Sequence, residues 1–369
     1  MTRGNLRNVI LVGDVRTRLA EIPDASVDTV ICSPPYVLTR DYQAVGQIGL
    51  EAHVDAWVEE LRSVARGLTR VLKPGGSLWL NVGDSYSRHE KTGAPAKSLL
   101  LGPERLVLAL LEDGWIVRNK VIWAKPNPMP ASVTDRLACS WEVIYFLVRD
   151  RTYEFSLDAI RVPHRSKRHG TCVDHKRTLP SPQTKSRPPV WAGPLAGSNA
   201  GLKALRDRGV PGHPLGANPR DVWSQATASV SGHHATYPPG LIERPLLATC
   251  PERTCRHCGI PWRRSAMRVV GGVATPGELR SECHCRAGWQ PGLVLDPFFG
   301  AGSTAIAAER HGRDWVGIEL NPAFAELAMT RIEAERARRR RNSTQNRADR
   351  PNDTDSASNI NQRKEVHHA

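Results

Sequence analysis

Residues 292–304, Gly-Leu-Val-Leu-Asp-Pro-Phe-Phe-Gly-Ala-Gly-Ser-Thr, combine a short apolar strand, an acidic residue and a glycine-rich turn that opens a helix. Gly300 and Gly302 let the backbone approach a ligand where a Cβ atom would collide, and Asp296 places a carboxylate at the strand's carboxyl end. A further strand, Trp315 to Glu319, ends in a second acid 17 residues beyond Gly302, near the spacing at which an acid meets ribose hydroxyls. A purely structural turn would explain the glycines but not both acids. Because the third glycine of Gly-x-Gly-x-x-Gly is missing, the pattern predicts a nucleoside ligand without a pyrophosphate.

A second apolar strand, Val27 to Cys32, runs into Ser33-Pro34-Pro35-Tyr36. The two prolines fix φ and remove two backbone donors, so we expect the local carbonyls and the Ser33 hydroxyl to face a crevice as acceptors. Such acceptors suit an exocyclic amino group, and Tyr36 offers a flat face for a base lifted out of a duplex. Pro-Pro pairs also occur in ordinary surface turns, so the tetrapeptide alone leaves both interpretations open.

Strands and helices alternate along most of the chain. We predict strands at 8–12, 27–32, 77–82, 292–296 and 315–319, and helices at 16–21, 52–71, 99–111, 241–249, 303–310 and from Pro322. This alternation is typical of an α/β protein with a mostly parallel, twisted sheet covered by helices, a Rossmann-like fold. Two β-rich runs, at 115–123 and 141–148, predict an antiparallel hairpin at one sheet edge.

The composition predicts a soluble cytoplasmic protein. The chain has 369 residues, of which 40% are hydrophobic, enough for a full core. It contains no apolar run of about 18 residues, and its polar start lacks the pattern of a secretory signal. Eight cysteines in such a chain indicate reduced thiols or metal ligands rather than disulfides.

The net charge of +14 is concentrated in one segment. Residues 161–220 hold twelve Lys or Arg against two Asp, together with nine prolines and seven glycines. Such a loop-rich basic insertion is what a polyanion-binding surface needs, although a solvated basic loop is the alternative.

A separate cluster predicts a metal site. Cys255-x-x-Cys258 and Cys283-x-Cys285 form two close pairs, as in a closed structural zinc site of the ribbon kind. Four free thiols are the alternative, and Cys250, His257 and His284 are alternative ligands.

These motifs together resemble the beta-class S-adenosylmethionine-dependent DNA amino-methyltransferases, which occur in restriction-modification systems and as solitary enzymes. The likeness covers most of residues 8–335, with the catalytic tetrapeptide before the cofactor motif, the circularly permuted order of that class. The supporting matches are Gly13-Asp14, Leu72-Lys-Pro-Gly-Gly76, Trp123-x-Lys-Pro-Asn-Pro-Met-Pro130, His234-Ala-Thr-Tyr-Pro238 and Gly317-Ile-Glu-Leu-Asn-Pro322.

The resemblance implies a role for each matching residue. The catalytic motif is Ser33, Pro34, Pro35 and Tyr36. The residues implied to bind S-adenosylmethionine are Asp14, Thr236, Tyr237, Asp296, Phe298, Phe299, Gly300, Gly302, Ser303, Thr304, Glu319 and Asn321. Asp14 would contact the adenine, Glu319 the ribose, and Thr236 and Tyr237 would close over the cofactor.

The implied reaction is methyl transfer to an amino group of a flipped base in double-stranded DNA. Ser33 at the first catalytic position favours cytosine N4, while adenine N6 stays an alternative. A catalytically inactive nucleic-acid-binding protein and an RNA methyltransferase are further alternatives. Carbon methylation would need a cysteine nucleophile, but strand alternation turns Cys32 away from Ser33, so we predict a packing role for it.

We therefore expect one methyltransferase domain with two insertions. Its parts are a catalytic half at 1–150, a basic target-recognition insertion at 151–220, a return to the core with a cofactor-lid helix at 221–249, a zinc ribbon at 250–290, a cofactor-binding half at 291–335 and a disordered tail at 336–369. The expected partners are double-stranded DNA, which implies association with the nucleoid, and a cognate restriction endonuclease where a restriction-modification system is present. Monomer and homodimer both stay open.

Overall fold

The computed structural model describes residues 6–163, 213, 215–231, 236–265, 268–270 and 273–348. The chain divides into two compact units. Unit 1 comprises residues 1–155, 221–262 and 281–369, and unit 2 comprises residues 156–220 and 263–280. Among the described residues, no helix is both long enough and apolar enough to cross a lipid bilayer.

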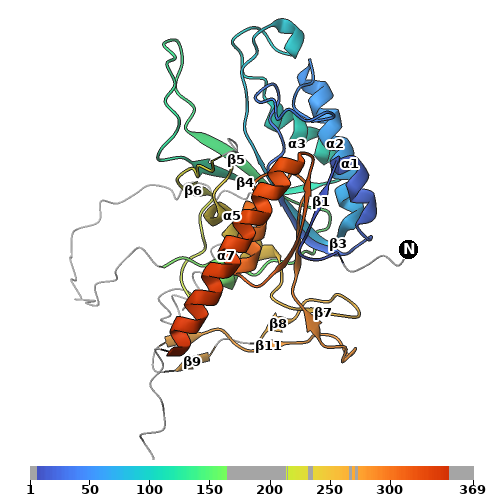
Figure 1. Ribbon diagram of the computed structural model, residues 1–369, viewed down its shortest axis with the longest axis vertical. Helices are drawn as coiled ribbons and strands as arrows, with labels where there is room; N and C mark the ends of the chain where they lie inside the picture. The colour runs from blue at the N-terminus through green and yellow to red at the C-terminus, as the bar shows by residue number, and fades with distance from the viewer. Residues whose placement is uncertain are drawn as a thin grey trace, which may run out of the picture. The chain divides into compact units, whose positions relative to one another are not determined.

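An eight-stranded sheet forms the centre of unit 1 (Figure 1). Its strands, in spatial order, are β1 (Val9–Val12), β14 (Asp314–Glu319), β13 (Leu293–Asp296), β2 (Val27–Cys32), β3 (Leu72–Val82), β5 (Trp141–Val148), β4 (Ile116–Ala124) and β6 (Val222–Ser224). Of these, β5 runs antiparallel to both of its neighbours, and the other pairings are parallel. The predicted mostly parallel α/β sheet is therefore confirmed.

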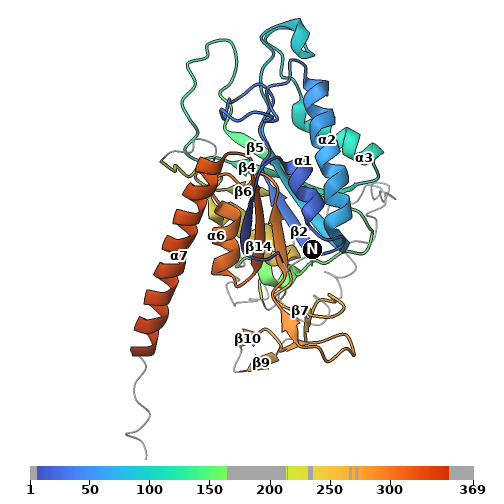
Figure 2. The same cartoon turned by 45° about the vertical axis from the view of Figure 1, so that its right-hand side comes forward.

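Helices cover both faces of the sheet (Figure 2). The first core cluster contains residues of α1 (Val15–Arg18), η1 (Leu19–Glu21), α2 (Val54–Val71) and α3 (Gly102–Glu112), and the second contains residues of α5 (Pro239–Thr249), α6 (Ser303–Arg310) and α7 (Pro322–Ala348). The remaining short helices are η2 (Glu90–Thr92) and η3 (Leu157–Ile160). Because both faces are covered, β2 and β13 are buried at every position, which explains why their sequences are continuous apolar runs rather than alternating ones.

The amphipathic helix α2 illustrates how this packing is encoded. Trp57, Leu61, Val64 and Leu68 recur at helical spacing and are each at most 5% exposed. His53 caps the helix start by accepting a hydrogen bond from the Asp55 backbone N–H at 3.1 Å. The buried face therefore docks the helix on the sheet beside the segment that follows β2.

The two motif-bearing strands are neighbours in the sheet. Strands β13 and β2 pair in parallel, with Val294 opposite Thr29 and Leu295 opposite Val30. Parallel neighbours end at the same edge, so Asp296 and Ser33 emerge side by side although 262 positions separate them in sequence.

Two sequence predictions about the sheet edge and the tail need correction. The β4–β5 hairpin is antiparallel as predicted, but β6 lies outside it, because β6 pairs with β4 and the Trp123 indole donates to the Gln225 carbonyl at 2.7 Å. The tail predicted to begin at 336 instead continues α7 to Ala348, and ion pairs hold some of its arginines, such as Arg336 with Glu309 and Arg338 with Glu335. Residues 349–369 lie outside the described part.

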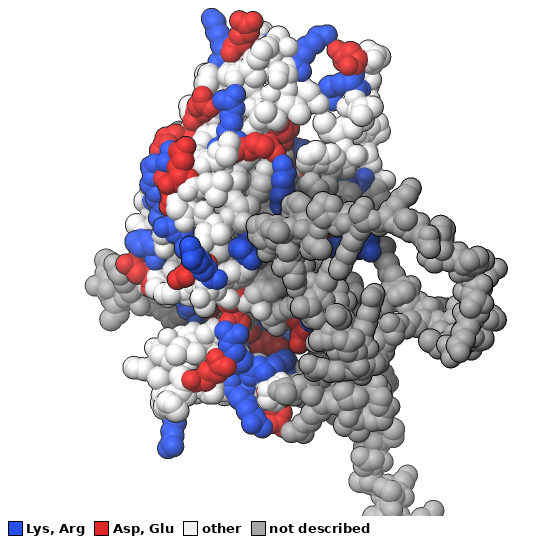
Figure 3. All heavy atoms as spheres, turned by 180° about the vertical axis from the view of Figure 1, so that it is seen from behind, with Lys and Arg blue, Asp and Glu red and all other residues white. Residues whose placement is uncertain are grey.

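Most of the predicted basic insertion lies outside the described residues, namely 164–212 and 214. Where described residues are visible in Figure 3, acidic and basic side chains are interspersed. The predicted ribbon region forms antiparallel two-stranded pairs: β7 (Thr254–Cys255) with β12 (Trp289–Gln290), β8 (Arg263–Arg264) with β11 (Leu279–Arg280), and β9 (Arg268–Val270) with β10 (Val273–Thr275). The last two pairs belong to unit 2.

Candidate active site

A pocket in unit 1 opens at the carboxyl ends of β1, β14, β13 and β2. Each strand contributes the residues at or just after its end: Asp14, Glu319, Phe298 and Ser33 are examples. The loop 42–48 and the segment before α5 complete the wall. This is the edge at which open α/β sheets bind ligands.

The predicted site residues divide into two groups. Those that line the pocket are Asp14, Ser33, Pro35, Thr236, Tyr237, Phe298, Phe299, Gly300, Ser303, Glu319 and Asn321. Those that do not line it are Pro34, Tyr36, Asp296, Gly302 and Thr304. In the matching segment His234-Ala-Thr-Tyr-Pro238, residues His234 and Ala235 lie outside the described residues.

Glu319 fixes the glycine-rich turn. Its Oε2 accepts from the Gly300 backbone N–H at 2.7 Å and its Oε1 accepts from the Asn321 N–H at 2.9 Å. Burial raises the pKa of Glu319, and these two backbone bonds partly oppose that shift. Gly300 and Gly302 adopt φ values of 50° and 77°, which favour glycine, and Gly302 begins α6. Glu319 therefore holds the turn in place at the start of α6, and Ser303, the first residue of that helix, lines the pocket.

Asp296 lies behind the pocket wall, where we had predicted direct contact with the cofactor. The carboxylate is fully buried and accepts from the Tyr237 hydroxyl at 2.7 Å, the Thr304 hydroxyl at 2.6 Å and the Phe298 N–H at 3.0 Å. Burial raises the pKa of Asp296 to about 6, although these three bonds oppose the shift. Asp296 thus joins the strand end, α6 and the segment before α5 around the pocket.

The two phenylalanines of the turn have different roles. Phe298 is half-buried and lines the pocket, whereas the Phe299 ring is 3% exposed and stacks on Trp315 with ring centroids 5.4 Å apart. The ring of Phe299 also covers Gly317. Nearby, the Ser303 hydroxyl is buried and has no hydrogen-bond partner among the described residues. A ligand with a polar group at this point would supply the missing bond.

Asp14 is held by Arg16 at the opposite side of the pocket. The carboxylate caps α1 through the Arg16 N–H at 2.8 Å and accepts from the Arg16 guanidinium at 2.9 Å. The hydrogen bond from the Arg16 side chain lowers the pKa of Asp14, so the group is ionised at neutral pH. Arg16 also donates to the Gly46 carbonyl and to Glu60, which ties the loop 42–48 to this wall.

The tetrapeptide 33–36 is fixed from several sides. The Trp57 indole donates to the Pro35 carbonyl at 2.9 Å. Gly49, at φ 104°, lies so close to the tetrapeptide that an added Cβ would be 3.1 Å from both Pro35 Cβ and the Tyr36 carbonyl. Ser33 Oγ lies 3.3 Å from the Tyr36 hydroxyl. The tetrapeptide is therefore a rigid support for Ser33 at the pocket wall.

Tyr36 does not present an open ring to the pocket, contrary to the stacking role we expected. Its hydroxyl donates to Glu142 Oε2 at 2.6 Å, and its ring packs against Gly83, where an added Cβ would lie 2.6 Å from a ring carbon. Burial, followed by the Glu142 carboxylate, raises the pKa of Tyr36 well above its ordinary value. The phenol therefore stays protonated at neutral pH.

Sequence reasoning missed several residues of the site. Glu142 was visible as a lone acid in the otherwise apolar strand β5. Its partner Asn81 lies in β3, and its partner Lys125 is the residue that follows β4. Tyr42 and Phe324, whose rings meet edge-on, also line the pocket. Nothing in their local sequence marks these two aromatic residues.

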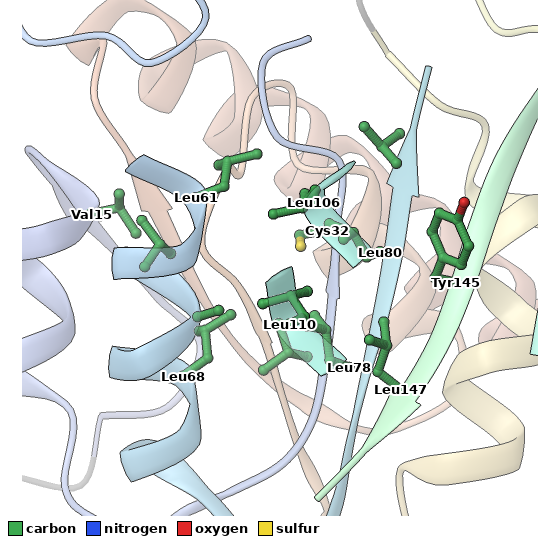
Figure 4. Packing of buried hydrophobic residues seen from close by; sticks show 14 of the residues in the cluster. Val15, Cys32, Leu61, Leu68, Leu78, Leu80, Leu106, Leu110, Tyr145 and Leu147 are labelled. Atoms are coloured by element: carbon green, nitrogen blue, oxygen red, sulfur yellow. The ribbon is translucent and has the colours of Figure 1, made fainter. Parts of the chain in front are cut away.

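Cys32 occupies the core, in agreement with its predicted packing role. It is 2% exposed and lies among leucines of the first core cluster (Figure 4). Burial raises the pKa of its thiol well above the ordinary value, which disfavours the thiolate that covalent catalysis requires.

The four predicted cysteine ligands come together. The Sγ atoms of Cys255, Cys258, Cys283 and Cys285 all lie within 4.8 Å of one another. Gly259, at φ 71°, donates to the Cys255 carbonyl at 3.0 Å and closes the turn after the first pair. Pairing of β7 with β12 brings the second pair of cysteines back to the first. The geometry suits a closed four-thiolate metal site.

Comparison with known proteins agrees with this arrangement. Residues 27–330 match the sequence model of a family described as DNA methylase. The chain is 30% identical over 350 residues to the type II methyltransferase M.SmaI of Serratia marcescens, an alignment covering 89% of this chain and 92% of the relative. A shorter alignment, 48% identical over 166 residues, covers 42% of this chain and 39% of M.SfiI of Streptomyces fimbriatus.

The fold is also similar to a solved structure, the PvuII DNA methyltransferase (cytosine-N4-specific). The TM-score is 0.54 at 16% identity, covering 89% of this chain and 87% of that one. The family match extends across both motif-bearing strands and the tetrapeptide between them. The chain therefore belongs to the DNA methylase family.

Proposed function

We propose that this protein transfers a methyl group from S-adenosylmethionine to an exocyclic amino group in double-stranded DNA, with cytosine N4 as the favoured target. The observation that carries the proposal is the shared pocket: Ser33 of the tetrapeptide 33–36 and Gly300 of the glycine-rich turn both line it. A donor held at the turn can therefore face an amine held at Ser33.

The pocket fits the cofactor in its polar and apolar parts. Glu319 supplies carboxylate oxygens suited to ribose hydroxyls, and Phe298 and Phe324 supply apolar surface. The Ser303 hydroxyl, which has no hydrogen-bond partner in the described part of the chain, supplies a buried polar contact. When bound, the cofactor provides a methyl group activated by its attachment to a positively charged sulfur.

The protein's part in the reaction is to orient the amine. The lone pair of an exocyclic amino nitrogen is delocalised into the ring, so acceptors on its N–H groups favour the geometry needed for attack. Ser33 Oγ, which lines the pocket, is the acceptor we assign first. The Pro34 carbonyl is a second candidate from the sequence, although Pro34 does not line the pocket in this structure. The nitrogen–carbon bond forms as the sulfur–carbon bond breaks, and the nitrogen then loses a proton to restore neutrality.

The target base must leave the stack to reach the pocket, which implies base flipping. The basic insertion at 151–220 is the segment we assign to DNA recognition, since its cations suit phosphates. The named relatives are type II methyltransferases, which supports a role in a restriction-modification system with a cognate endonuclease. Serine at position 33 supports cytosine through the tendency of the family, and adenine N6 is the competing product.

One experiment tests activity and target together. Purified protein is incubated with DNA and S-adenosylmethionine, the DNA is digested to nucleosides, and the methylated product is identified by mass. We expect N4-methylcytosine. N6-methyladenine would reassign the base, methylation confined to RNA would reassign the substrate, and the absence of any product would refute the proposal.

The matched control is Ser33→Ala. Loss of the acceptor should lower kcat by about a hundredfold or more, because preorganised polar groups contribute on that scale. Cofactor affinity should persist, since the turn at Gly300 is untouched. An alanine variant with wild-type turnover would refute the role of Ser33.

We also propose a structural zinc ion at Cys255, Cys258, Cys283 and Cys285. Tetrahedral zinc–thiolate geometry puts sulfurs about 3.8 Å apart, and the four Sγ atoms already lie within 4.8 Å of one another. Purified protein should contain one zinc per chain, and Cys258→Ser should lose it while Cys139→Ser, at an exposed cysteine elsewhere, should keep it. Protein without zinc whose stability is unchanged in chelator would contradict the site.

A further inference from the structure

Glu142 is a partly buried acid whose contacts converge on the catalytic serine without reaching the pocket. Its side chain is 16% exposed, and its Oε1 pairs with Lys125. Its Oε2 accepts from the Tyr36 hydroxyl at 2.6 Å and from the Asn81 amide at 3.2 Å. Tyr36 in turn lies 3.3 Å from Ser33 Oγ, so a chain of hydrogen bonds leads from Glu142 to the pocket wall.

The hydrogen bonds from Glu142 through Tyr36 to Ser33 have a defined donor-to-acceptor direction. A carboxylate accepts hydrogen bonds and cannot donate, so the single proton of the Tyr36 hydroxyl points to Glu142 Oε2 at 2.6 Å, a much shorter contact than the one to Asn81 Oδ1 at 3.4 Å. The phenolic oxygen can then only accept from Ser33. The Ser33 proton is thus directed away from the pocket, and the lone pairs of Oγ are left to accept from a ligand.

The surroundings make this polarity difficult to reverse. Asn81 is 6% exposed, and its amide nitrogen donates both to Glu142 and to the Val143 carbonyl at 3.2 Å, which fixes the amide orientation. Lys125 can only donate, so it requires an acceptor at Oε1 of Glu142. Both neighbours therefore demand that position 142 accept.

We propose that Glu142 is a positioning residue that keeps the Ser33 hydroxyl in its accepting orientation through Tyr36. This inference rests on the proposed amino-methyltransferase function and identifies how the protein selects its substrate class. An amino group presents N–H donors and is matched by an accepting serine. A keto oxygen in the same place meets another acceptor and is rejected. The hydrogen-bond relay formed by Glu142, Tyr36 and Ser33 therefore excludes thymine O4 and guanine O6.

The variant Glu142→Gln reverses the relay without changing its shape. The Lys125 cation needs an acceptor more than the neutral Asn81 amide does, because that amide keeps its hydrogen bond to the Val143 carbonyl. The glutamine carbonyl therefore turns to Lys125, and its NH₂ group turns to Tyr36. The Tyr36 oxygen then accepts from position 142, and its own proton turns to Ser33 Oγ at 3.3 Å, which is nearer than the alternative acceptor, Asn81 Oδ1 at 3.4 Å. Ser33 Oγ loses a lone pair to Tyr36, and kcat should fall about a hundredfold. The Kd for S-adenosylmethionine and the KM for DNA should stay within about threefold of wild type, since no pocket-lining group changes.

A double variant separates this mechanism from simple structural damage. Tyr36→Phe removes the phenol, so Ser33 becomes free to rotate and kcat should fall only about tenfold. In Glu142→Gln/Tyr36→Phe the reversed relay no longer exists, so activity should recover to the level of Tyr36→Phe alone. If the two substitutions damaged the structure independently, their fold-losses in kcat would instead multiply.

A matched control lies in α3, where Glu104 has two partners on the β4–β5 hairpin. Glu104 accepts from Lys120 at 2.7 Å and from the Tyr145 hydroxyl at 3.3 Å, the same trio of residue types outside the pocket. Glu104→Gln should leave kcat unchanged.

Wild-type kcat in Glu142→Gln, or multiplied losses in the double variant, would overturn the relay while leaving the proposed function intact. Wild-type protein that transfers no methyl group to DNA would instead end the proposed function itself.

Discussion

Replacing Gly317 by alanine should damage both stability and cofactor binding, because the glycine makes room for a buried ring. Gly317 lies in β14 opposite Asp296 of β13 and Ile10 of β1. An added Cβ would lie 2.3, 2.4 and 2.6 Å from three carbons of the Phe299 ring, far inside van der Waals contact. The ring cannot swing aside, since it is 3% exposed and stacked on Trp315.

The magnitude follows from this overlap. Overpacking a core typically costs about 1–3 kcal/mol, and three simultaneous clashes place Gly317→Ala near the upper end. To relieve the clash between the added Cβ and the Phe299 ring, the glycine-rich turn must move outward. This movement breaks the hydrogen bond that the Phe299 N–H donates to the Ile318 carbonyl at 2.9 Å. Displacing Phe299 also displaces Gly300, so affinity for S-adenosylmethionine should fall by about tenfold, equivalent to ~1.4 kcal/mol.

Urea unfolding measures the first effect and calorimetric titration with S-adenosylmethionine the second. Phe299→Leu in the Gly317→Ala background should restore part of the stability, so the double variant should be less destabilised than the sum of the single variants by about 1–2 kcal/mol. Gly312→Ala serves as control: φ is 64° there and nothing lies within 4 Å, so only the backbone conformation is penalised. Wild-type stability in Gly317→Ala, or strict additivity with Phe299→Leu, would refute the reasoning.

Two further predictions concern buried carboxylates. Because burial raises the pKa of Asp296 to about 6, the folded state holds its proton more tightly than the unfolded state. Stability should therefore decline by up to about 3 kcal/mol as pH rises from 4 through 6, and a urea series should show no such slope in Asp296→Asn. Equal slopes in both proteins would contradict this. Asp28→Ala should lower the free energy of unfolding by about 3 kcal/mol, because it leaves Lys73 without the Asp28 carboxylate, which is only 4% exposed. Glu21→Ala should lower it by less than about 1 kcal/mol, because the ion pair of Glu21 with Arg18 is largely solvated. Similar losses in the two alanine variants would argue against burial as the deciding factor.

The sequence predicted the central elements closely. Strand β2, strand β5 and helix α6 have the bounds that we expected from apolar runs and from glycine and proline punctuation. The meeting of Ser33 with Gly300 was also predictable, because both follow strands whose apolar character on two faces indicates the interior of a parallel sheet. Local pattern and one topological rule were sufficient for these features.

Other features depended on partners distant in sequence. The arginine-rich end of α7 suggested disorder by composition, yet Glu309 lies one helix away and pairs with Arg336. Asp296 resembled a direct ligand contact, but the Tyr237 hydroxyl, 59 residues upstream, encloses its carboxylate. Whether a polar side chain faces a ligand or a protein partner is decided by tertiary packing, which the local sequence does not encode.

The order of motifs along the chain is less important than the order of strands in the sheet. The tetrapeptide and the glycine-rich turn are neighbours because β2 hydrogen-bonds to β13, with Leu295 opposite Val30. A sheet imposes this adjacency whichever strand is made first, provided that the connecting helices can cross its faces. The positions that must be kept are therefore those that set strand register and those that fix each turn on its strand, such as Glu319 on Gly300 and Trp57 on Pro35. Loosening either link would separate donor from acceptor while leaving both motifs intact in sequence.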